Sequence, residues 1–308
     1  MIAFVFPGQG SQRVGMGKAL AEASAAARAT FEEADEALGE PLSALCFEGP
    51  IESLTLTENA QPALLTVSLA VHRWLTSQGL TPAFVAGHSV GEYSANVAAG
   101  TFSFADGLRV VRRRGQYMQE AVPVGSGAMA AILGLDPGEV VRACEEAAQG
   151  DIVSPANMNG GGQVVISGSR DAVGRAGDRA KALGAKRVVP LQVSAPFHCA
   201  LMQPAEARLA PELRALKVCD PSVPIVANVD AEVKRDAASA IEALVAQVSA
   251  PVRWEQVVRR LASEGVTTYV EVGPGTVLTG LVKKIHREAT VVSVGSPADF
   301  GALEAVLR

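Results

Sequence analysis

The chain has 308 residues, of which 48% are hydrophobic, and its formal net charge is −5. This apolar content is enough for a packed core and excludes global disorder, and the length suits one large domain with an insertion, or two domains. The acidic balance argues against a nucleic acid as the main partner, because phosphate binding relies on basic surface.

The four cysteines are widely spaced and form no CxxC pair. They are Cys46, Cys144, Cys199 and Cys219. This spacing indicates reduced thiols in a cytoplasmic protein, and neither a disulfide framework nor a zinc site.

The first segment, residues 1–6, is apolar but ends at Pro7 and lacks a basic leader. It is far too short to span a bilayer, and no later segment is long and apolar enough, so we expect no membrane association. We predict that residues 1–6 form a first core strand.

Strand-like apolar runs alternate with helix-like runs over most of the chain, which is typical of an α/β fold with a largely parallel sheet. After the first strand, residues 61–78 have a helical pattern with leucines at core spacing. A second helix is predicted over residues 104–120, where Ser103 and Asp106 resemble a capping box and Pro123 follows the end.

Between these two helices, residues 87–91 (GHSVG) have the pattern of a nucleophile elbow. The apolar residues before them predict a buried strand, and the Ala-rich residues 92–99 predict a helix. A sharp strand-to-helix turn needs flanking glycines, because strand and helix approach closely. Such a turn holds the Ser89 hydroxyl at a helix N-terminus, where backbone N–H groups favour an oxyanion. The alternative is a buried turn without chemistry.

Residues 125–194 differ in the order of their predicted elements, with strand-like and helix-like runs in the order βαββαβ. This is the order of a ferredoxin-like unit, so we predict a subdomain here, inserted into a larger α/β body of residues 1–124 and 195–308. Within the subdomain, we expect a strand over residues 152–156 and a flexible glycine-rich connection over residues 157–163.

A serine nucleophile needs a base, and the chain has four histidines. His72 lies in a helical pattern and His286 in a basic run, and both patterns are typical of structural or solvated positions. His88 adjoins Ser89, but neighbouring strand residues point to opposite faces. His198 follows a predicted strand, where catalytic residues of α/β sheets lie, and is the base by elimination. A loop histidine bonded to the backbone is the alternative.

No aspartate or glutamate in the second half stands out as a third catalytic member. A backbone or amide carbonyl could hold the imidazole of His198 instead, which gives a dyad. Such a partner leaves the imidazolium less stabilised than a carboxylate does.

Three successive arginines, Arg112, Arg113 and Arg114, lie in the predicted helix 104–120. Consecutive helical residues point about 100° apart, so the three cannot all face one side. We expect one arginine to reach inward, where its guanidinium fork suits a substrate carboxylate. A structural ion pair is the alternative.

The glycine-rich residues 7–12 (PGQGSQ) follow the first strand. A turn here could offer a backbone N–H to a reacting carbonyl, or cradle a phosphate. The segment lacks the Lys-Ser/Thr of a P-loop and the GxGxxG of a dinucleotide site, and a simple turn is the remaining alternative.

Taken together, these motifs resemble those of malonyl-CoA:acyl carrier protein transacylases of bacterial fatty-acid synthesis, and more distantly those of polyketide synthase acyltransferase domains. The motifs follow the family's order over nearly the whole chain. They are residues 6–12 (FPGQGSQ), 57–65 (TENAQPALL), 87–93 (GHSVGEY), 114–115, 118–119, 157–159 with 163–168, 196–198 (PFH), 247 with 251–254, and 271–275 (EVGPG). The resemblance implies an α/β-hydrolase-like body with a ferredoxin-like subdomain.

The resemblance also implies catalytic roles. Ser89 is then the nucleophile and His198 its base, and Gln247 orients His198 through its carbonyl. The backbone N–H groups of Gln9 and Val90 form the oxyanion hole.

Further residues are implied in substrate binding. Arg114 is the arginine that binds the free carboxylate of malonyl. Phe197 crowds a 2-methyl branch and so favours malonyl over methylmalonyl. The remaining predicted contacts are Met118, Asn159 and His88.

The function that the resemblance implies is ping-pong malonyl transfer from malonyl-CoA to acyl carrier protein through a malonyl-serine ester. It implies no metal and no cofactor, and we expect a cytoplasmic monomer. The alternatives are a polyketide-type acyltransferase for malonyl or methylmalonyl units, a serine esterase or thioesterase, and a non-catalytic docking relative.

Carrier proteins of this pathway are acidic, so docking calls for a basic patch on the enzyme. Two groups of residues are candidates, and a solvated face is the alternative for either. They are Arg175, Arg179, Lys181, Lys186 and Arg187 of the subdomain, and Lys283, Lys284 and Arg287 of the body.

Overall fold

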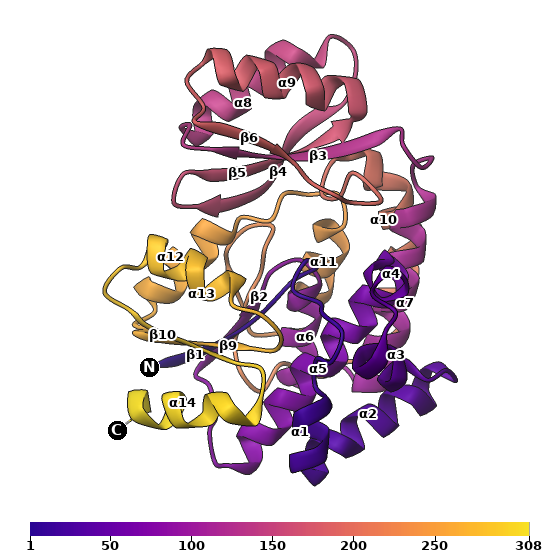
Figure 1. The fold of residues 1–308 in the computed structure, drawn as a ribbon, viewed down its shortest axis with the longest axis vertical. Coiled ribbons are helices and arrows are strands. Elements are labelled where there is room, and N and C mark those ends of the chain that lie inside the picture. The colour runs from indigo at the N-terminus through magenta and orange to yellow at the C-terminus, as the bar shows by residue number, and fades with distance from the viewer. Residues whose placement is uncertain (308) are drawn as a thin grey trace.

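The computed structural model describes residues 1–307 and divides them between a large α/β body and a smaller sheet with two helices (Figure 1). The body contains a six-stranded sheet whose strands run parallel except for the antiparallel edge strand β8. In spatial order the strands are β10 (Thr290–Val294), β9 (Thr268–Val272), β1 (Ile2–Phe6), β2 (Phe84–Gly87), β7 (Ile225–Val226) and β8 (Val233–Lys234).

Helices cover both faces of this sheet, which is why its strands are apolar on both sides. The alternation along β1 sends Phe4 and Phe6 to one face and Ala3 and Val5 to the other. The first face is covered by α5 (Thr57–Ser77), α6 (Val90–Ala98) and α7 (Phe104–Glu120), and the second by α12 (Trp254–Ser263) and α13 (Val277–Ile285).

The other helices of the body lie around this frame (Figure 1). They are α1 (Lys18–Ala23), α2 (Ala25–Leu38), α3 (Leu42–Glu48), α4 (Ile51–Thr55), α10 (Gln203–Arg214), α11 (Ala237–Gln247) and α14 (Phe300–Leu307), with short 3-10 turns at Ala200–Met202 and Pro297–Asp299. None of the helices in residues 1–307 combines the length and the apolar character needed to cross a membrane.

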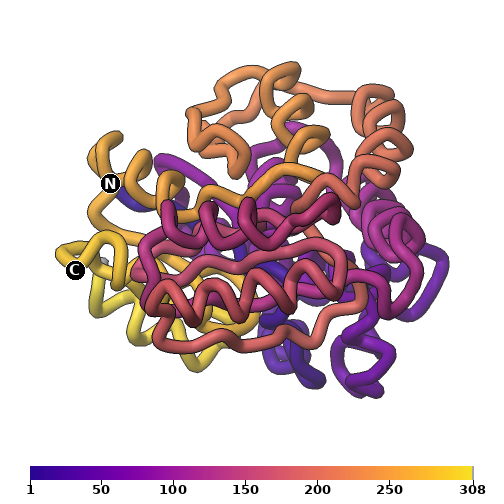
Figure 2. The backbone as a smooth tube through the Cα atoms, turned by 90° about the horizontal axis from the view of Figure 1, so that it is seen from above, coloured from indigo at the N-terminus to yellow at the C-terminus, as the bar shows by residue number. Residues whose placement is uncertain are grey.

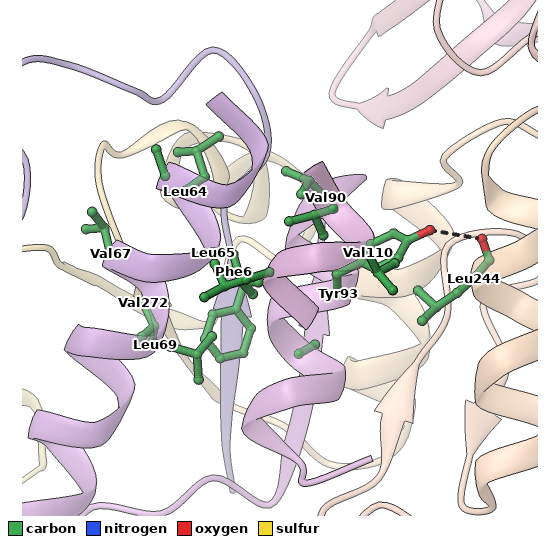
Figure 3. Close-up of a cluster of buried hydrophobic side chains, with 14 of the residues drawn as sticks. Phe6, Leu64, Leu65, Val67, Leu69, Val90, Tyr93, Val110, Leu244 and Val272 are labelled. Carbon is green, nitrogen blue, oxygen red and sulfur yellow. Dashed lines mark hydrogen bonds between the residues drawn. The ribbon is translucent and has the colours of Figure 1, made fainter. Parts of the chain in front are cut away.

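The body core joins the first strand to the helix that follows the elbow (Figure 3). Phe6 of β1 packs among leucines of α5, including Leu65 and Leu69. Tyr93 of α6 is buried, and its hydroxyl donates to the Leu244 carbonyl of α11 over 3.3 Å. This packing holds β1, α5, α6 and α11 together around the end of β2.

The helix starts depend on local polar contacts. As predicted, Ser103 caps α7: its Oγ accepts from the Asp106 backbone N at 3.1 Å and donates to the Asp106 carboxylate at 2.7 Å. Helix α5 begins at Thr57, one turn before the predicted residue 61. The helix continues through Pro62, although a proline at this position lacks the N–H for one hydrogen bond of the helix and its ring crowds the preceding turn.

The smaller sheet has four antiparallel strands in the order β4-β5-β3-β6. Seen from above, two helices lie side by side over the outer face of this sheet (Figure 2). In chain order the elements are β3 (Gly127–Leu133), α8 (Pro137–Ala148), β4 (Val153–Gly160), β5 (Gln163–Ser169), α9 (Arg170–Ala182) and β6 (Arg187–Pro190). This βαββαβ arrangement on a parallel-sheet body confirms the predicted fold class.

One predicted element in this unit is wrong. Residues 157–160 are not part of a flexible connection but continue strand β4, and the turn to β5 is Gly161-Gly162. Asparagines disfavour strands on average, but this stretch is paired on both sides. It pairs with β5 through two bulges, and the Met158 N–H donates to the Val252 carbonyl of the body over 2.8 Å.

Candidate active site

Ser89 occupies the sharp turn between β2 and α6, with a backbone φ of 54° and ψ of −115°. A non-glycine residue at positive φ is strained and persists only where its surroundings impose it. Here the surroundings require glycine on both sides. An added Cβ at Gly87 would lie 1.9 Å from the Gly91 carbonyl carbon, and one at Gly91 would lie 2.1 Å from the Phe6 carbonyl oxygen. The predicted strand-turn-helix elbow is therefore present.

Asn228 supports this turn from the neighbouring strand. It follows β7, which pairs with β2, and its side chain continues the contacts between the two strands. Its Oδ1 accepts from the Ser89 backbone N at 2.9 Å, and its Nδ2 donates to the Gly87 carbonyl at 2.7 Å. Sequence reasoning missed Asn228, because only the strand order brings it to the elbow.

His198 lies next to the Ser89 hydroxyl. The distance from His198 Nε2 to Ser89 Oγ is 2.7 Å, and that from His198 Nδ1 to the Gln247 backbone O is 3.0 Å. A carbonyl can only accept, so Nδ1 carries the proton and Nε2 is left to accept from the serine. The structure thus joins Ser89, His198 and Gln247 in one line of hydrogen bonds, with a carbonyl in the third place.

The imidazole of His198 is neutral over a wide pH range. Its side chain is buried, and this desolvation, with the nearby Arg114 charge, lowers its pKa to about 3. At neutral pH the residue is therefore in the form that can take a proton.

Arg114 is the arginine that reaches inward, and it is only 1% exposed. Its Nη2 lies 3.3 Å from Ser89 Oγ and 3.0 Å from Gln247 Oε1, and its Nη1 lies 2.8 Å from Gln61 Oε1. Its protein partners are thus neutral oxygens. A buried guanidinium without an anion is energetically unfavourable, so this group is suited to an anionic ligand.

The neighbouring arginines behave differently. Arg112 pairs with Glu40, and Arg113, half exposed, pairs with Glu212 at 3.0 Å. Within residues 1–307, Arg114 forms no such ion pair. A structural ion pair, the alternative to a substrate carboxylate as the partner of these arginines, is therefore present at Arg112 and Arg113.

A cavity of about 430 Å³ opens onto the Ser89 hydroxyl. Seven of the residues predicted for the site line it, namely Gln9, His88, Ser89, Arg114, Met118, Phe197 and His198. The described part of the chain has no cluster of His, Cys, Asp and Glu side chains that could hold a metal ion.

Three predicted residues lie outside this lining. Gln247 lies on the far side of His198, with its backbone O 3.0 Å from His198 Nδ1, and Val90 is the first residue of α6. Asn159, predicted as a substrate contact, is buried behind His88, with its Oδ1 2.9 Å from His88 Nε2. Asn159 therefore reaches the cavity only through His88, whereas the nearby Asn157 lines it.

Two backbone N–H groups near Ser89 lack a partner in the protein. Within the hydrogen bonds of residues 1–307, neither Gln9 N nor Val90 N donates to another residue. Val90 is the first residue of α6, where helical N–H groups have no intrahelical acceptor. The Gln9 turn is held from the side, because Gln9 Nε2 donates to Thr57 Oγ1 over 3.2 Å.

Glu92 is a second site residue that sequence reasoning missed. It is 1% exposed, and its Oε2 accepts from Gln247 Nε2 at 2.7 Å and from the Asn228 backbone N at 3.0 Å. Burial raises the pKa of Glu92 to about 7. A signal was available, because Glu92 lies about one helical turn after Ser89 and is the only charged residue in residues 90–99.

The two basic groups predicted for docking differ in their local charge balance. In the subdomain, Arg175 pairs with Asp151, Arg179 with Glu146, and Lys181 with Asp178. In the body, Lys283, Lys284 and Arg287 form no ion pair with other described residues. The body group thus retains more uncompensated charge.

The chain is similar to known proteins over nearly its whole length. The model of the acyl transferase domain family matches residues 3–298. The malonyl CoA-acyl carrier protein transacylase of Bacillus subtilis is 52% identical over 297 residues, which cover 96% of this chain and 94% of the relative. The Escherichia coli protein of the same name is 52% identical over 301 residues, which cover 97% of each chain.

Two solved structures have nearly the same fold. An acyl carrier protein S-malonyltransferase from Vibrio cholerae has a TM-score of 0.96 and 49% identity, and covers 98% of this chain and 99% of its own. A malonyl-transacylase in complex with a type II polyketide acyl carrier protein also has a TM-score of 0.96 and 49% identity, with 99% of each chain covered. This chain belongs to the acyl transferase domain family.

Proposed function

We propose that this chain transfers a malonyl group from malonyl-CoA to the phosphopantetheine thiol of an acyl carrier protein in fatty-acid synthesis. The names of the relatives support this activity, and the solved complex of a similar enzyme with its carrier supports the acceptor. The observation that carries the proposal is the buried Arg114 guanidinium, which lies 3.3 Å from Ser89 Oγ and forms no ion pair within residues 1–307.

Arg114 explains the choice of a carboxylated acyl group. The free carboxylate of malonyl supplies the missing negative charge, and the planar guanidinium can bind both of its oxygens. Acetyl has no such group and leaves the buried charge without an anion. Sites that are built to bind a polar group discriminate strongly against substrates that lack it.

In the first half-reaction, Ser89 Oγ attacks the thioester carbon of malonyl-CoA while His198 Nε2 takes the hydroxyl proton. The C–S bond then breaks, and the CoA sulfur leaves with the proton that His198 held. The malonyl-serine ester remains. The Gln247 carbonyl holds Nδ1–H throughout, so the ring keeps the orientation and tautomer that this transfer needs.

The developing oxyanion needs donors that are in place before the reaction. The backbone N–H groups of Gln9 and Val90 are proposed for this role, since Gln9 lines the cavity, Val90 directly follows Ser89, and neither N–H donates to another residue of the range 1–307. In comparable sites the loss of one such donor costs roughly 3–4 kcal/mol of barrier.

In the second half-reaction, the carrier thiol gives its proton to His198 Nε2 and attacks the ester carbon. The bond to Ser89 Oγ breaks, and the serine recovers its proton from His198. The transfer uses only side-chain and backbone groups of this chain and two thiols, so the proposal includes no cofactor. All groups of the site come from one copy of the chain, which suits a monomer, and we place the reaction in the cytoplasm.

Phe197 and Met118 are proposed to shape the acyl pocket. Both line the cavity, are at most 9% exposed, and present apolar surface toward the acyl group. A 2-methyl branch on the acyl group would add volume in this packed region. We therefore favour malonyl over methylmalonyl, and a polyketide-type enzyme for methylmalonyl units is the second candidate.

A serine esterase is a weaker candidate for this site. Esterases of this type hold the catalytic histidine with a carboxylate, whereas His198 is held by a carbonyl. The nearby carboxylate, Glu92, bonds Gln247 and not the imidazole.

One assay tests the proposal directly: transfer from malonyl-, methylmalonyl- and acetyl-CoA to a carrier protein that bears phosphopantetheine, compared side by side. We expect malonyl to be transferred fastest, because only malonyl combines a carboxylate with an unbranched chain. Faster transfer of methylmalonyl would favour the polyketide-type alternative. Faster transfer of acetyl, or release of free acid without transfer, would overturn the proposal.

A further inference from the structure

The side-chain amide of Gln247 lies between the Ser89 turn and Arg114, and its two ends meet opposite kinds of partner. Its Nε2 lies 3.0 Å from the Ser89 carbonyl, 2.7 Å from Glu92 Oε2 and 3.4 Å from Asn228 Oδ1. All three are acceptors, since Asn228 Oδ1 itself receives the Ser89 N–H. Its Oε1 meets Arg114 Nη2, which can only donate, at 3.0 Å. One orientation of the amide satisfies both ends, and the reverse orientation satisfies neither.

Glu92 makes the shortest of these contacts to the amide. Its Oε2 also accepts from the Asn228 backbone N at 3.0 Å, so two donors from different segments converge on one buried oxygen. That oxygen cannot move without leaving a buried N–H unsatisfied, which is costly. Glu92 is thus placed to hold Gln247 and touches neither Ser89 Oγ nor the cavity.

We propose that Glu92 is a positioning residue: by holding Gln247 Nε2, it keeps Gln247 Oε1 on Arg114 and so aims the guanidinium at the acyl carboxylate. The inference rests on the proposed function, because it requires Arg114 to bind that carboxylate. An oxygen at the place of Oε2 is what matters, since both donors need only an acceptor there. The negative charge of Glu92 is not required.

Two variants separate the position of this oxygen from its charge. Glu92→Gln keeps an oxygen within reach and removes the charge, whereas Glu92→Asp keeps the charge but is one methylene shorter. We expect the Gln variant to stay within about threefold of wild type in KM for malonyl-CoA, and the Asp variant to raise it by about tenfold or more. The residual transfer of acetyl should change much less, because it does not use Arg114.

A matched control is available in Glu271, another buried carboxylate. It accepts from the backbone N–H groups of Leu278 and Thr279 at 3.0 and 2.7 Å, and it does not line the cavity. We expect Glu271→Asp to lower the melting temperature and to leave the ratio of malonyl to acetyl transfer unchanged.

The role of Glu92 is refuted if Glu92→Asp keeps the wild-type KM, if Glu92→Gln is as impaired as Glu92→Asp, or if malonyl and acetyl transfer fall equally. If Glu92→Asp does not fold, Glu92→Gln decides, because a folded Gln variant with a raised malonyl KM contradicts the inference and one with a normal KM supports it. The wild-type protein, measured in the same assay, separates the proposed function from the role of Glu92. If the wild type transfers no malonyl group, the proposed function itself is overturned.

Discussion

The proposed chemistry of the site depends on a contrast between two basic side chains, one charged and one neutral, that lie within hydrogen-bond reach of the Ser89 hydroxyl. Arg114 is permanently charged and held by amide oxygens, which orient it without neutralising it. His198 is kept neutral by burial and by that same charge. Ser89 thus has the proposed carboxylate-binding group on one side and the proposed proton acceptor on the other.

Arg114→Ala tests the first of these groups. We expect kcat/KM for malonyl-CoA to fall roughly 30-fold or more, because the substrate carboxylate loses its buried partner. This factor corresponds to a loss of about 2 kcal/mol of transition-state stabilisation. Transfer of acetyl should fall far less, so the malonyl-to-acetyl ratio measured in competition should collapse. Arg113→Ala, on the exposed side of the same helix, is the control and should leave the ratio unaltered. An unaltered ratio in Arg114→Ala would remove Arg114 from carboxylate binding.

The pH dependence of the first half-reaction tests His198. A lowered pKa means that the neutral, proton-accepting form persists to more acidic pH than for a free imidazole. The profile of kcat/KM for malonyl-CoA, which reports the free enzyme, should therefore show no acidic limb near 6.5 and should keep the base form down to about 3. In Arg114→Ala, followed with acetyl-CoA, the limb should move upward. A limb near 6.5 in the wild type would contradict the assignment of a buried, neutral base.

The sequence motifs point to the residues that we propose to react, but not to the residues that hold them in place. Ser89 was indicated by an elbow pattern and His198 by elimination among four histidines. Helical geometry predicted one inward arginine among three, and only the family resemblance selected Arg114. Asn228 was not predicted, because its contacts depend on strand neighbours that spacing does not encode. Glu92 was missed although its place one helical turn after Ser89 could be seen in the sequence. Asn159, predicted as a substrate contact, bonds His88, which itself lines the cavity.

Among the elements, the β2–α6 turn is held by contact between backbones. Strand β1, the turn and helix α6 approach so closely that Gly91 lies against the Phe6 carbonyl. This leaves no room for a side chain, so the elbow is a packing constraint as well as a conformational one.

Gly91→Ala tests that constraint. The added methyl would meet the Phe6 carbonyl oxygen at 2.1 Å, and we expect a loss of about 1–3 kcal/mol or more in the free energy of unfolding. Denaturant unfolding measures this loss, and transfer activity should fall because Ser89 shifts. Gly174→Ala is the control: it lies on α9 with open space around its Cβ, and should gain up to about 1 kcal/mol. Equal stability of the two variants would show that the elbow tolerates a side chain.

Elements with strong periodicity could be predicted from sequence, whereas strand β4 could not. Helix α7 has both a cap and a clear apolar face, and its bounds agree with the prediction. The second half of β4 carries asparagines and glycine, which favour turns on local propensity alone. It is a strand because β5 lies on one side and Val252 of the body on the other, which is tertiary information.

For the molecule as a whole, the site is assembled where distant segments meet. Ser89 comes from the middle of the body and His198 from the chain as it returns from the smaller sheet. Gln247 ends helix α11, and Gln9 follows the first strand. A sequence can nominate such residues one by one, but only the order of the strands and the packing of the helices bring them to one cavity.

Ser89 is proposed to carry the acyl group between two thiols. Mixing the protein with malonyl-CoA and measuring its intact mass tests this most directly. We predict one added malonyl group on Ser89, stable until a carrier protein that bears phosphopantetheine is supplied and then transferred to it, while Ser89→Ala stays unmodified. Rapid loss of the adduct to water before the carrier is added would indicate a hydrolase and not a transferase. An adduct on the Ser89→Ala variant would show that Ser89 does not carry the acyl group.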